Sequence, residues 1–374
     1  MSPIQRPASV PDPKDVSPSR PTVSAVAFNF NGDERILSTV AALRRQSHPI
    51  EAIVVVDNAS TDGSPEAIRE RFPDVQVVDL GENLGISTAR NRGLATVSSD
   101  LAFMVDGDVY ADDDCLAEMV QAWLRNGKPA VICPRVVLIP EEDTVQADGA
   151  GIHFTGAMIL RHAYQPVASV SHEETVVGGC IGACYLMDRR VAINAGGFDE
   201  TFFHYHEDLE FCVRMRAYGH TFLFTPAIVR HDRGEGTVGL SFRGHEGAYP
   251  RRRAYYSIRH HALLLLIHYR FRTLFLLSPV LLLYEAASLG AGLFGGFGRE
   301  WFRAWWWIVT NPATIREKRG RIQARRVARD RDLLEGGPIP LAPGFLRSGL
   351  ASLAAATVSG ASRLWWSLVR PLIG

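Results

Sequence analysis

Apolar runs and amphipathic segments alternate in the first third of the chain, and this alternation limits the possible folds more than any other feature. The runs are rich in β-branched residues, as in AIVVV at residues 52–56, and such runs are typical of strands buried on both faces of a parallel sheet. Between them, segments such as residues 34–46 carry apolar residues at helical spacing. The alternation predicts a doubly wound α/β sheet. Its first strands are expected at residues 23–30, 52–56, 75–80 and 101–108.

Polar residues follow these apolar runs at the positions where the strands are expected to end. Sheets of this class bind ligands at the carboxyl ends of their strands. The candidate ligand contacts on this ground are Asn29, Asn31, Asp57, Asn83, Asp106 and Asp108.

The stretch FMVDGDVYADDD, residues 103–114, places two groups of aspartates behind one strand. Asp106 and Asp108 flank a glycine and can point at one cation, since Mg²⁺ and Mn²⁺ favour carboxylate oxygens and share them with substrate phosphates. A solvated turn would show the same pair, so the pair alone leaves both interpretations open. Residues 112–114 are expected to begin a helix, where acids favour the positive end of the dipole.

The second half of this domain carries a further acidic pair, Glu207-Asp208, at the start of a helical pattern that Gly219 closes. A strand is expected at TFLFTP, residues 221–226, and His231 follows it. Structurally, the two acids could simply favour a helix N-terminus, and a lone histidine is usually part of the packing.

Composition excludes some classes of function. The formal net charge is zero, which gives no indication of nucleic-acid binding. The five cysteines include no CxxC pair, so we expect small buried side chains in a reducing cytosol rather than a zinc site at Cys180 and Cys184. Residues 1–22 are rich in Pro and Ser and are expected to be a disordered lead without a secretory signal.

The chain becomes more apolar from about residue 254. Residues 273–298 contain no Lys or Arg and only one acid, Glu285, while residues 316–331 contain eight basic side chains. A single membrane crossing fits poorly with the positive-inside tendency. We therefore expect interfacial or re-entrant helices on the cytoplasmic face of a membrane. A helical hairpin that crosses twice and a soluble helical subdomain remain alternatives.

Four motifs in a fixed order resemble those of family 2 glycosyltransferases with the GT-A fold. They are VVVDNASTDGSPE, NLGISTARNRGL, the D-x-D pair and GGFDETFFHYHEDLEFCVRMRAYG, the last similar to the rhamnosyltransferase-like branch. The resemblance covers roughly residues 23–270. It implies a mixed α/β catalytic domain over residues 23–253, with a helical, membrane-associated region over residues 254–374.

The resemblance also implies roles for individual residues. Asp57 would meet the nucleotide base, Arg90 the diphosphate or ribose, and His231 would complete the metal site. Asn29, Asn31, Asn83 and Asp106 would lie near the nucleotide, and Asp106 and Asp108 would bind Mn²⁺ or Mg²⁺. Asp208 would be the catalytic base, with Glu207 as the alternative. Residues 231–247 are a candidate lid.

The sequence departs from the family pattern at three places. Glu210 stands where an aspartate is usual after the acidic pair, Asp-Gly-Asp replaces the Asn-Pro-Asp of the rhamnosyl-like branch, and His260 replaces an asparagine. The second departure weakens any inference about the donor sugar.

We expect an inverting, metal-dependent glycosyltransferase of cell-surface polysaccharide synthesis. Its donor would be a nucleotide-diphospho-sugar and its acceptor a glycan or polyprenyl-linked molecule. Two alternatives are a nucleotidyltransferase and a membrane-associated sugar-nucleotide-binding protein without turnover. The first lacks its Gly-rich basic signature near residues 26–34, and the second would be expected to have lost an acidic pair.

Overall fold

The computed structural model describes residues 20–140, 143–232, 251–339 and 349–373. Its N-terminal α/β part contains strands β1 (Val23–Asn29), β2 (Ile53–Asp57), β3 (Gln76–Asp79), β4 (Leu101–Asp106), β5 (Val109–Ala111), β6 (Val131–Ile139), β7 (Val145–Ala147), β8 (Ala150–His153), β9 (Met158–Leu160), β10 (Thr175–Val177), β11 (Cys184–Asp188) and β12 (Phe222–Asp232). Its helices are α1 (Asp33–Arg44), α2 (Ser64–Arg71), α3 (Ile86–Thr96), α4 (Cys115–Arg125), η1 (Val167–Ser169), α5 (Arg189–Asn194) and α6 (Glu207–Ala217).

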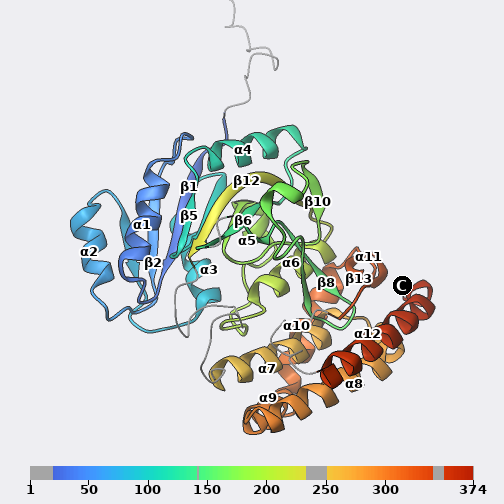
Figure 1. Ribbon diagram of the computed structural model, residues 1–374. Coiled ribbons are helices and arrows are strands. Elements are labelled where there is room, and N and C mark those ends of the chain that lie inside the picture. Colours follow the sequence, from blue (N-terminus) through green and yellow to red (C-terminus); the bar gives the residue numbers. More distant parts are fainter. Residues whose placement is uncertain (1–19, 141–142, 233–250, 340–348, 374) are drawn as a thin grey trace, which may run out of the picture.

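A mixed ten-stranded sheet lies at the centre of the molecule (Figure 1), and eight of its strands follow the order β10–β12–β6–β11–β4–β1–β2–β3. The other two lie off this path, where β5 pairs with β12 and β7 pairs with β6. The strands β1, β2, β3 and β4 are parallel to their neighbours within this group, as the alternating pattern predicts. The later strand β11 enters antiparallel between β4 and β6. The predicted fold class, a mixed α/β sheet flanked by helices, is therefore confirmed.

Each strand of the parallel half contributes side chains to two cores. In β1, Val23, Ala25 and Ala27 pack in the core that includes α1 and α4. The alternate residues Val26 and Phe28 pack in the core that includes α3 and α6. Because side chains of a strand alternate between faces, burial on both sides produces the continuous apolar runs seen in the sequence. All five cysteines are buried and free, as expected.

The C-terminal elements form a helical layer at one end of the α/β body (Figure 1). They are α7 (Arg251–His268), α8 (Phe271–Phe294), α9 (Gly298–Thr310), α10 (Pro312–Arg325), α11 (Asp330–Leu333), β13 (Leu334–Glu335), α12 (Gly349–Val369) and η3 (Arg370–Leu372). A third core joins this layer to the N-terminal α/β part through α6 and β8, with Leu209 and Ile152 among its residues. The layer is not wholly helical, because β13 pairs with β8 in a second sheet of three strands.

Two expected boundaries can be located in the structure. The expected division between residues 253 and 254 falls within α7, whose described residues begin at Arg251. The expected disordered lead comprises residues 1–22, of which residues 1–19 lie outside the described residues. Pro21 is buried, and the backbone N–H of Thr22 donates to Asp100 Oδ2 at 3.1 Å.

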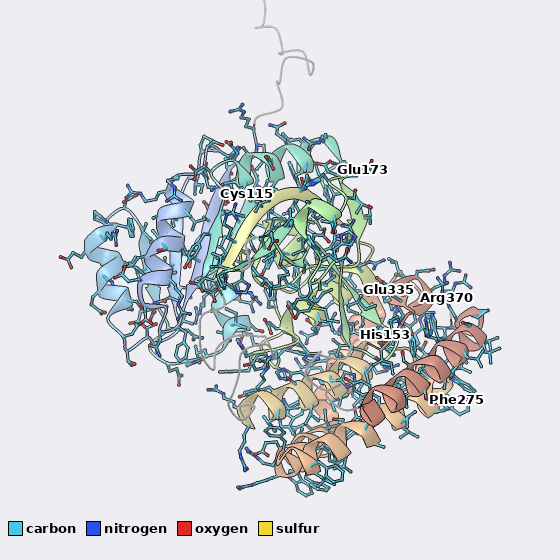
Figure 2. The ribbon with its side chains drawn as sticks, in the orientation of Figure 1. Cys115, His153, Glu173, Phe275, Glu335 and Arg370 are labelled. Atoms are coloured by element: carbon cyan, nitrogen blue, oxygen red, sulfur yellow. The ribbon has the colours of Figure 1, made fainter. Side chains whose placement is uncertain are left out.

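Among the described helices, α8 alone is long and apolar enough to cross a membrane, with a mean hydropathy of 1.7 over an 18-residue window of which 12% is buried. Figure 2 shows Phe275 of α8 on the outer side of the helical layer, and this side chain is 77% exposed. Most of the apolar surface of α8 therefore has no protein partner in the described chain.

Candidate active site

The ends of β1 and β2 hold two of the expected nucleotide contacts against each other. Asp57 and Asn29 are each 2% exposed. Asn29 Nδ2 donates to Asp57 Oδ1 at 2.7 Å. The backbone N–H of Ser60 donates to Asp57 Oδ2 at 2.9 Å, and the Ser60 hydroxyl donates to Oδ1 at 2.6 Å. Both carboxylate oxygens of Asp57 are thus engaged in fixing the turn after β2.

Asn31 and Asn83 are half-buried and also stabilise turns at this edge of the sheet. Asn31 has a positive φ of 51°, and its Oδ1 accepts from the backbone N–H of Thr61 at 2.8 Å. Asn83 Oδ1 accepts from the backbone N–H of Gly85 at 3.1 Å. These asparagines shape the loops at the strand ends, where backbone groups form the rim of the site.

The two aspartates of the D-x-D pair stand at the end of β4 and beside β12. Their side chains are 31% and 28% exposed, so both reach solvent. A Cβ at Gly107 would lie 2.4 Å from the carbonyl oxygen of Phe28, which explains the glycine between them. The backbone N–H of Asp232 donates to Asp108 O at 2.9 Å, and this pairing brings His231 next to Asp108.

His231 and Asp108 form the part of the site that best fits a divalent cation. His231 Nε2 lies 3.4 Å from Asp108 Oδ1, and His231 Nδ1 lies 2.7 Å from Gln146 Oε1. With Nδ1–H donating to Gln146, a neutral ring presents its Nε2 lone pair to a carboxylate oxygen. Two facing acceptors repel unless a proton or cation lies between them. A histidine whose other ring nitrogen is hydrogen-bonded is also the usual form of a metal ligand.

The described residues contain no group of three or more His, Cys, Asp or Glu side chains close enough to bind a metal ion by themselves. Protein sites for Mg²⁺ often use one or two carboxylates and share the ion with substrate phosphates. Burial and the charge of Asp108 raise the pKa of Asp106 to about 7, against the opposing effect of Arg90. A bound cation would favour the ionised form of this acid.

Arg90 of α3 joins the two acidic elements of the sequence. Its side chain is 1% exposed, Nη1 donates to Glu207 Oε1 at 2.8 Å, and Nη2 lies 3.4 Å from Asp106 Oδ1. Nη2 also donates to the carbonyl of Gly182 at 3.1 Å, and the guanidinium lies over the Phe198 ring. Nη1 and Nη2 of Arg90 are thus engaged with protein groups, and the expected contact of Arg90 with the diphosphate or ribose stays a prediction.

Glu207 and Asp208 differ in burial and in hydrogen-bond partners. Glu207 is 6% exposed and held by Arg90, whereas Asp208 is half-buried. Asp208 Oδ2 accepts from the backbone N–H of Gly182 at 3.0 Å. Burial and the neighbouring Glu207 charge raise the pKa of Asp208 to about 6. Asp208 is thus the more accessible carboxylate and a stronger base than an ordinary aspartate.

The segment before Asp208 has a strained backbone that the helical layer holds in place. Tyr205 and His206 both have φ of 66°, which costs about 1–3 kcal/mol for each such residue. His260 Nδ1 donates to the carbonyl of Tyr205 at 2.7 Å, and Arg259 Nη2 donates to the carbonyl of Thr201 at 2.8 Å. His260, a departure from the family pattern, thus supports the loop that carries the acidic pair.

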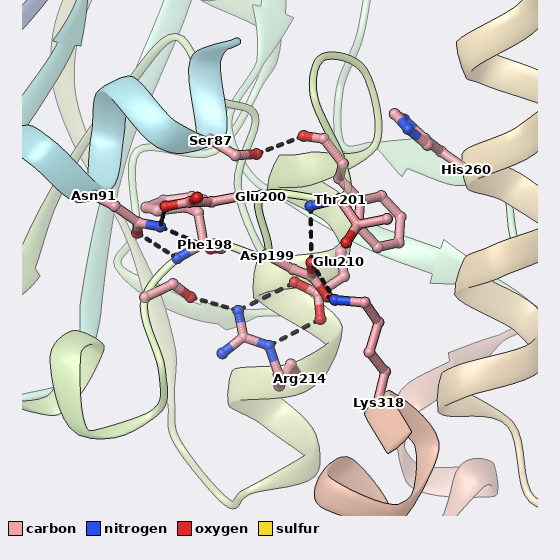
Figure 3. A network of polar contacts seen from close by, with 12 residues as sticks. Ser87, Asn91, Phe198, Asp199, Glu200, Thr201, Glu210, Arg214, His260 and Lys318 are labelled. Atoms are coloured by element: carbon pink, nitrogen blue, oxygen red, sulfur yellow. Dashed lines mark hydrogen bonds and ion pairs between the residues drawn. The ribbon is translucent and has the colours of Figure 1, made fainter. Parts of the chain in front are cut away.

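A second set of polar contacts surrounds Arg214 and Asp199, near this loop (Figure 3). Arg214 donates to Glu210 Oε1 at 2.8 Å and to the carbonyl of Ala195 at 2.7 Å. Lys318 of α10 donates to both oxygens of Asp199, at 2.7 and 2.8 Å. A cavity of about 340 Å³ lies among these residues. Sequence patterns did not predict Lys318 or Arg214, because their partners are distant in the chain or hidden within a helix.

The remaining aspartates of residues 103–114 lie outside the metal pair. Asp113 pairs with Arg45 and Asp112 with Arg230, each at 3.1 Å. Asp114 immediately precedes α4. The expected lid, residues 231–247, lies outside the described residues after Asp232.

Comparison with known proteins agrees with this arrangement. Residues 24–193 match the family model for glycosyl transferase family 2. This match, over somewhat less than half of the chain, is to family 2 glycosyltransferases. This finding confirms the resemblance inferred from the motifs and, at the level of the family, the expected class of enzyme.

Two relatives come from Mycobacterium tuberculosis. N-acetylglucosaminyl-diphospho-decaprenol L-rhamnosyltransferase is 26% identical over 234 residues, which are 57% of this chain and 76% of that protein. Pre-mycofactocin glycosyltransferase is 28% identical over 230 residues, 61% of this chain and 44% of that protein. Among solved structures, GalNAc-T7 with UDP, GalNAc and Mn²⁺ matches with a TM-score of 0.55 and 13% identity, over 76% of this chain and 55% of that chain. This likeness shows the GT-A fold.

Proposed function

We propose that this family 2 glycosyltransferase is an inverting, metal-dependent hexosyltransferase that uses a nucleotide-diphospho-sugar. The observation that carries the proposal is the buried Arg90, which joins Asp106 of the D-x-D pair to Glu207 beside Asp208. Two acidic elements about a hundred residues apart in the sequence thereby face one site. One element suits a cation that holds a diphosphate, and the other supplies an accessible carboxylate.

Asp208 is proposed to take the proton from the acceptor hydroxyl as its oxygen attacks the anomeric carbon. The bond from that carbon to the donor diphosphate breaks on the opposite face, and its electron pair leaves with the diphosphate. Asp106, Asp108 and His231 would hold a Mn²⁺ or Mg²⁺ ion, which supplies charge neutralisation for the departing diphosphate. A single displacement of this kind inverts the anomeric configuration.

Arg90 and Glu207 are proposed as positioning residues. The buried guanidinium fixes Glu207, and the Glu207 charge in turn raises the pKa of Asp208. The turns at Asn29, Asn31, Asp57 and Asn83 are proposed to shape the nucleotide end of the site, with side chains engaged in the turns and backbone groups available to the ligand.

The acceptor is proposed to be a lipid-linked glycan reached at the cytoplasmic face of a membrane. Exposed apolar side chains gather on α8 and α9, where Phe275 is 77%, Leu282 69% and Trp306 71% exposed. Surfaces of this kind on helices suit the boundary between headgroups and acyl chains. The part of the chain from α7 onward is proposed as the membrane-associated region, and the acceptor named in the mycobacterial rhamnosyltransferase supports this chemistry.

A thermal-shift screen of UDP-, GDP- and dTDP-sugars with Mn²⁺ tests the proposal. A rise in melting temperature with one donor class, lost in Asp108→Asn but kept in Asp113→Asn, is expected. Release of the matching nucleoside diphosphate in the presence of a membrane fraction would then report turnover. Failure of every donor to shift a folded protein would contradict the proposal.

A further inference from the structure

The first turn of α7 presents three consecutive arginines beside the loop that carries the acidic pair. Arg251 and Arg252 are exposed and Arg253 is half-buried. The Arg252 guanidinium lies 4.8 Å from the Phe203 ring centroid and 5.7 Å from that of Tyr256. The Phe203 and Tyr256 rings are stacked on each other at 5.3 Å. Arg252 is therefore held by aromatic faces of the catalytic loop and of its own helix.

The positive charge of Arg252 has little compensation in the described part of the chain. The first turn of α7 contains no acid, and cations there oppose the positive end of the helix dipole. Arg251 pairs with Glu300 of α9 at 3.4 Å. No described carboxylate lies within ion-pair distance of Arg252. Aromatic stacking leaves the N–H edge of a guanidinium able to bind phosphate oxygens in a bidentate way.

The loop that contacts the arginines also contacts the helix that carries Arg90. The carbonyl of Phe203 accepts from the backbone N–H of Ile86, at the start of the helix that carries Arg90, at 2.9 Å. The pKa of His204 is lowered to about 4 by burial and by Arg90, with smaller effects from Arg252 and Arg253 and an opposing one from Asp208. Charges from α7 and the acidic pair thus act on the same loop residue.

The helix α9 is joined to the start of α7 by the Arg251–Glu300 pair and carries exposed apolar side chains on its other face. Phe302 is 58% and Trp306 71% exposed on this helix. The donor diphosphate is assigned elsewhere, to the cation site at Asp106 and Asp108. A ligand for the α7 arginines should therefore combine its own anionic group with an apolar chain.

We propose that Arg252, supported by Arg251 and Arg253, binds the phosphate or diphosphate group of the lipid-linked acceptor. The lipid chain then lies along the exposed apolar residues of α9, and the sugar end reaches Asp208. This inference rests on the proposed function and adds to it the residues that select an anionic acceptor.

The test measures how the full-length protein in nonionic detergent binds farnesyl diphosphate and farnesol, by tryptophan fluorescence or calorimetry. The variants are Arg252→Gln and Arg252→Lys. Arg71→Gln is the matched control, since Arg71 is also exposed and its guanidinium lies 5.8 Å from the Phe72 ring centroid. Sedimentation with phosphatidylglycerol vesicles separates acceptor binding from binding of phospholipid headgroups. Circular dichroism melting checks that each variant is folded.

The wild type should bind farnesyl diphosphate more tightly than farnesol. Arg252→Gln should raise the Kd for the diphosphate about tenfold, which corresponds to about 1.4 kcal/mol, and leave the Kd for farnesol and vesicle binding within about twofold. Arg252→Lys should fall between, because it keeps the charge without the planar fork. Arg71→Gln should match the wild type.

An unchanged Kd for the diphosphate in Arg252→Gln, or no preference for it in the wild type, would overturn the inference. An equal loss of vesicle binding would also overturn it, because the arginine would then bind phospholipid headgroups. Donor binding with Mn²⁺, measured in the same samples, keeps the two proposals apart. Loss of the donor shift with intact diphosphate selectivity would count against the proposed function alone.

Discussion

Replacing Asp208 by Asn should remove most of the turnover while leaving the fold intact. The substitution is nearly isosteric, and the amide oxygen of Asn can still accept from the backbone N–H of Gly182, which now lies 3.0 Å from Asp208 Oδ2. The side chain loses only its capacity to take a proton. General-base catalysis typically contributes about 10²–10⁴-fold, so kcat should fall by that factor, about 3–5 kcal/mol in activation free energy.

The pH profile of the wild type tests the same role independently. Burial and the charge of Glu207 raise the pKa of Asp208 from 3.8 to about 6, which strengthens its proton affinity by about 3 kcal/mol. A base acts when deprotonated, so kcat/KM should increase as the pH rises through about 6 and then level off. An unperturbed aspartate would place this limb near pH 4.

The assay is release of nucleoside diphosphate at saturating Mn²⁺ between pH 5 and 8.5, with donor and acceptor present. Asp114→Asn is the control, since Asp114 is exposed at the start of α4 and accepts no capping hydrogen bond from the helix. It should keep the wild-type rate and profile. If Asp208→Asn retained more than a tenth of the wild-type kcat, with donor binding unchanged, the base would have to be another group.

Three further outcomes follow from the geometry. Asp108→Asn should abolish the Mn²⁺-dependent increase in donor affinity, measured by calorimetry, while Asp113→Asn keeps it; equal behaviour of the two would contradict the metal assignment. The Arg214 ion pair helps to lower the pKa of Glu210 to about 2. The ionised Glu210 should therefore contribute about 3 kcal/mol to the free energy of unfolding above pH 4.5, and this contribution should be lost as the pH falls toward 2. Urea titrations at pH 6 and 3.5 measure the change, and a free energy of unfolding that did not depend on pH would refute the prediction. Phe275→Glu should weaken sedimentation with lipid vesicles without changing the melting temperature, whereas unchanged sedimentation would argue against a membrane contact at α8.

Local patterns were sufficient to predict the parallel half of the sheet. Its strands are buried on both faces and appear as continuous apolar runs, while each of its helices buries one stripe and shows apolar residues at helical spacing. Both patterns can be recognised in the sequence. The start of α6 at Glu207 also follows a local rule, since acids favour a helix N-terminus. The glycine of Asp-Gly-Asp does not, because it is the carbonyl of the distant Phe28 that leaves no room for a side chain. The antiparallel insertion of β11 between β4 and β6 could not be read from its neighbours, because strand pairing depends on contacts between distant segments.

The candidate site was predictable as a set of residue types but not as an arrangement. The sequence by itself determined which acids could meet a cation or a proton, and it placed them at strand ends and a helix start. Only the tertiary structure decided that Arg90 is buried between Asp106 and Glu207, which leaves Asp208 as the more accessible carboxylate. The burial, the pKa and the orientation of a side chain depend on its surroundings. At this site those surroundings come from segments about a hundred residues away in the sequence.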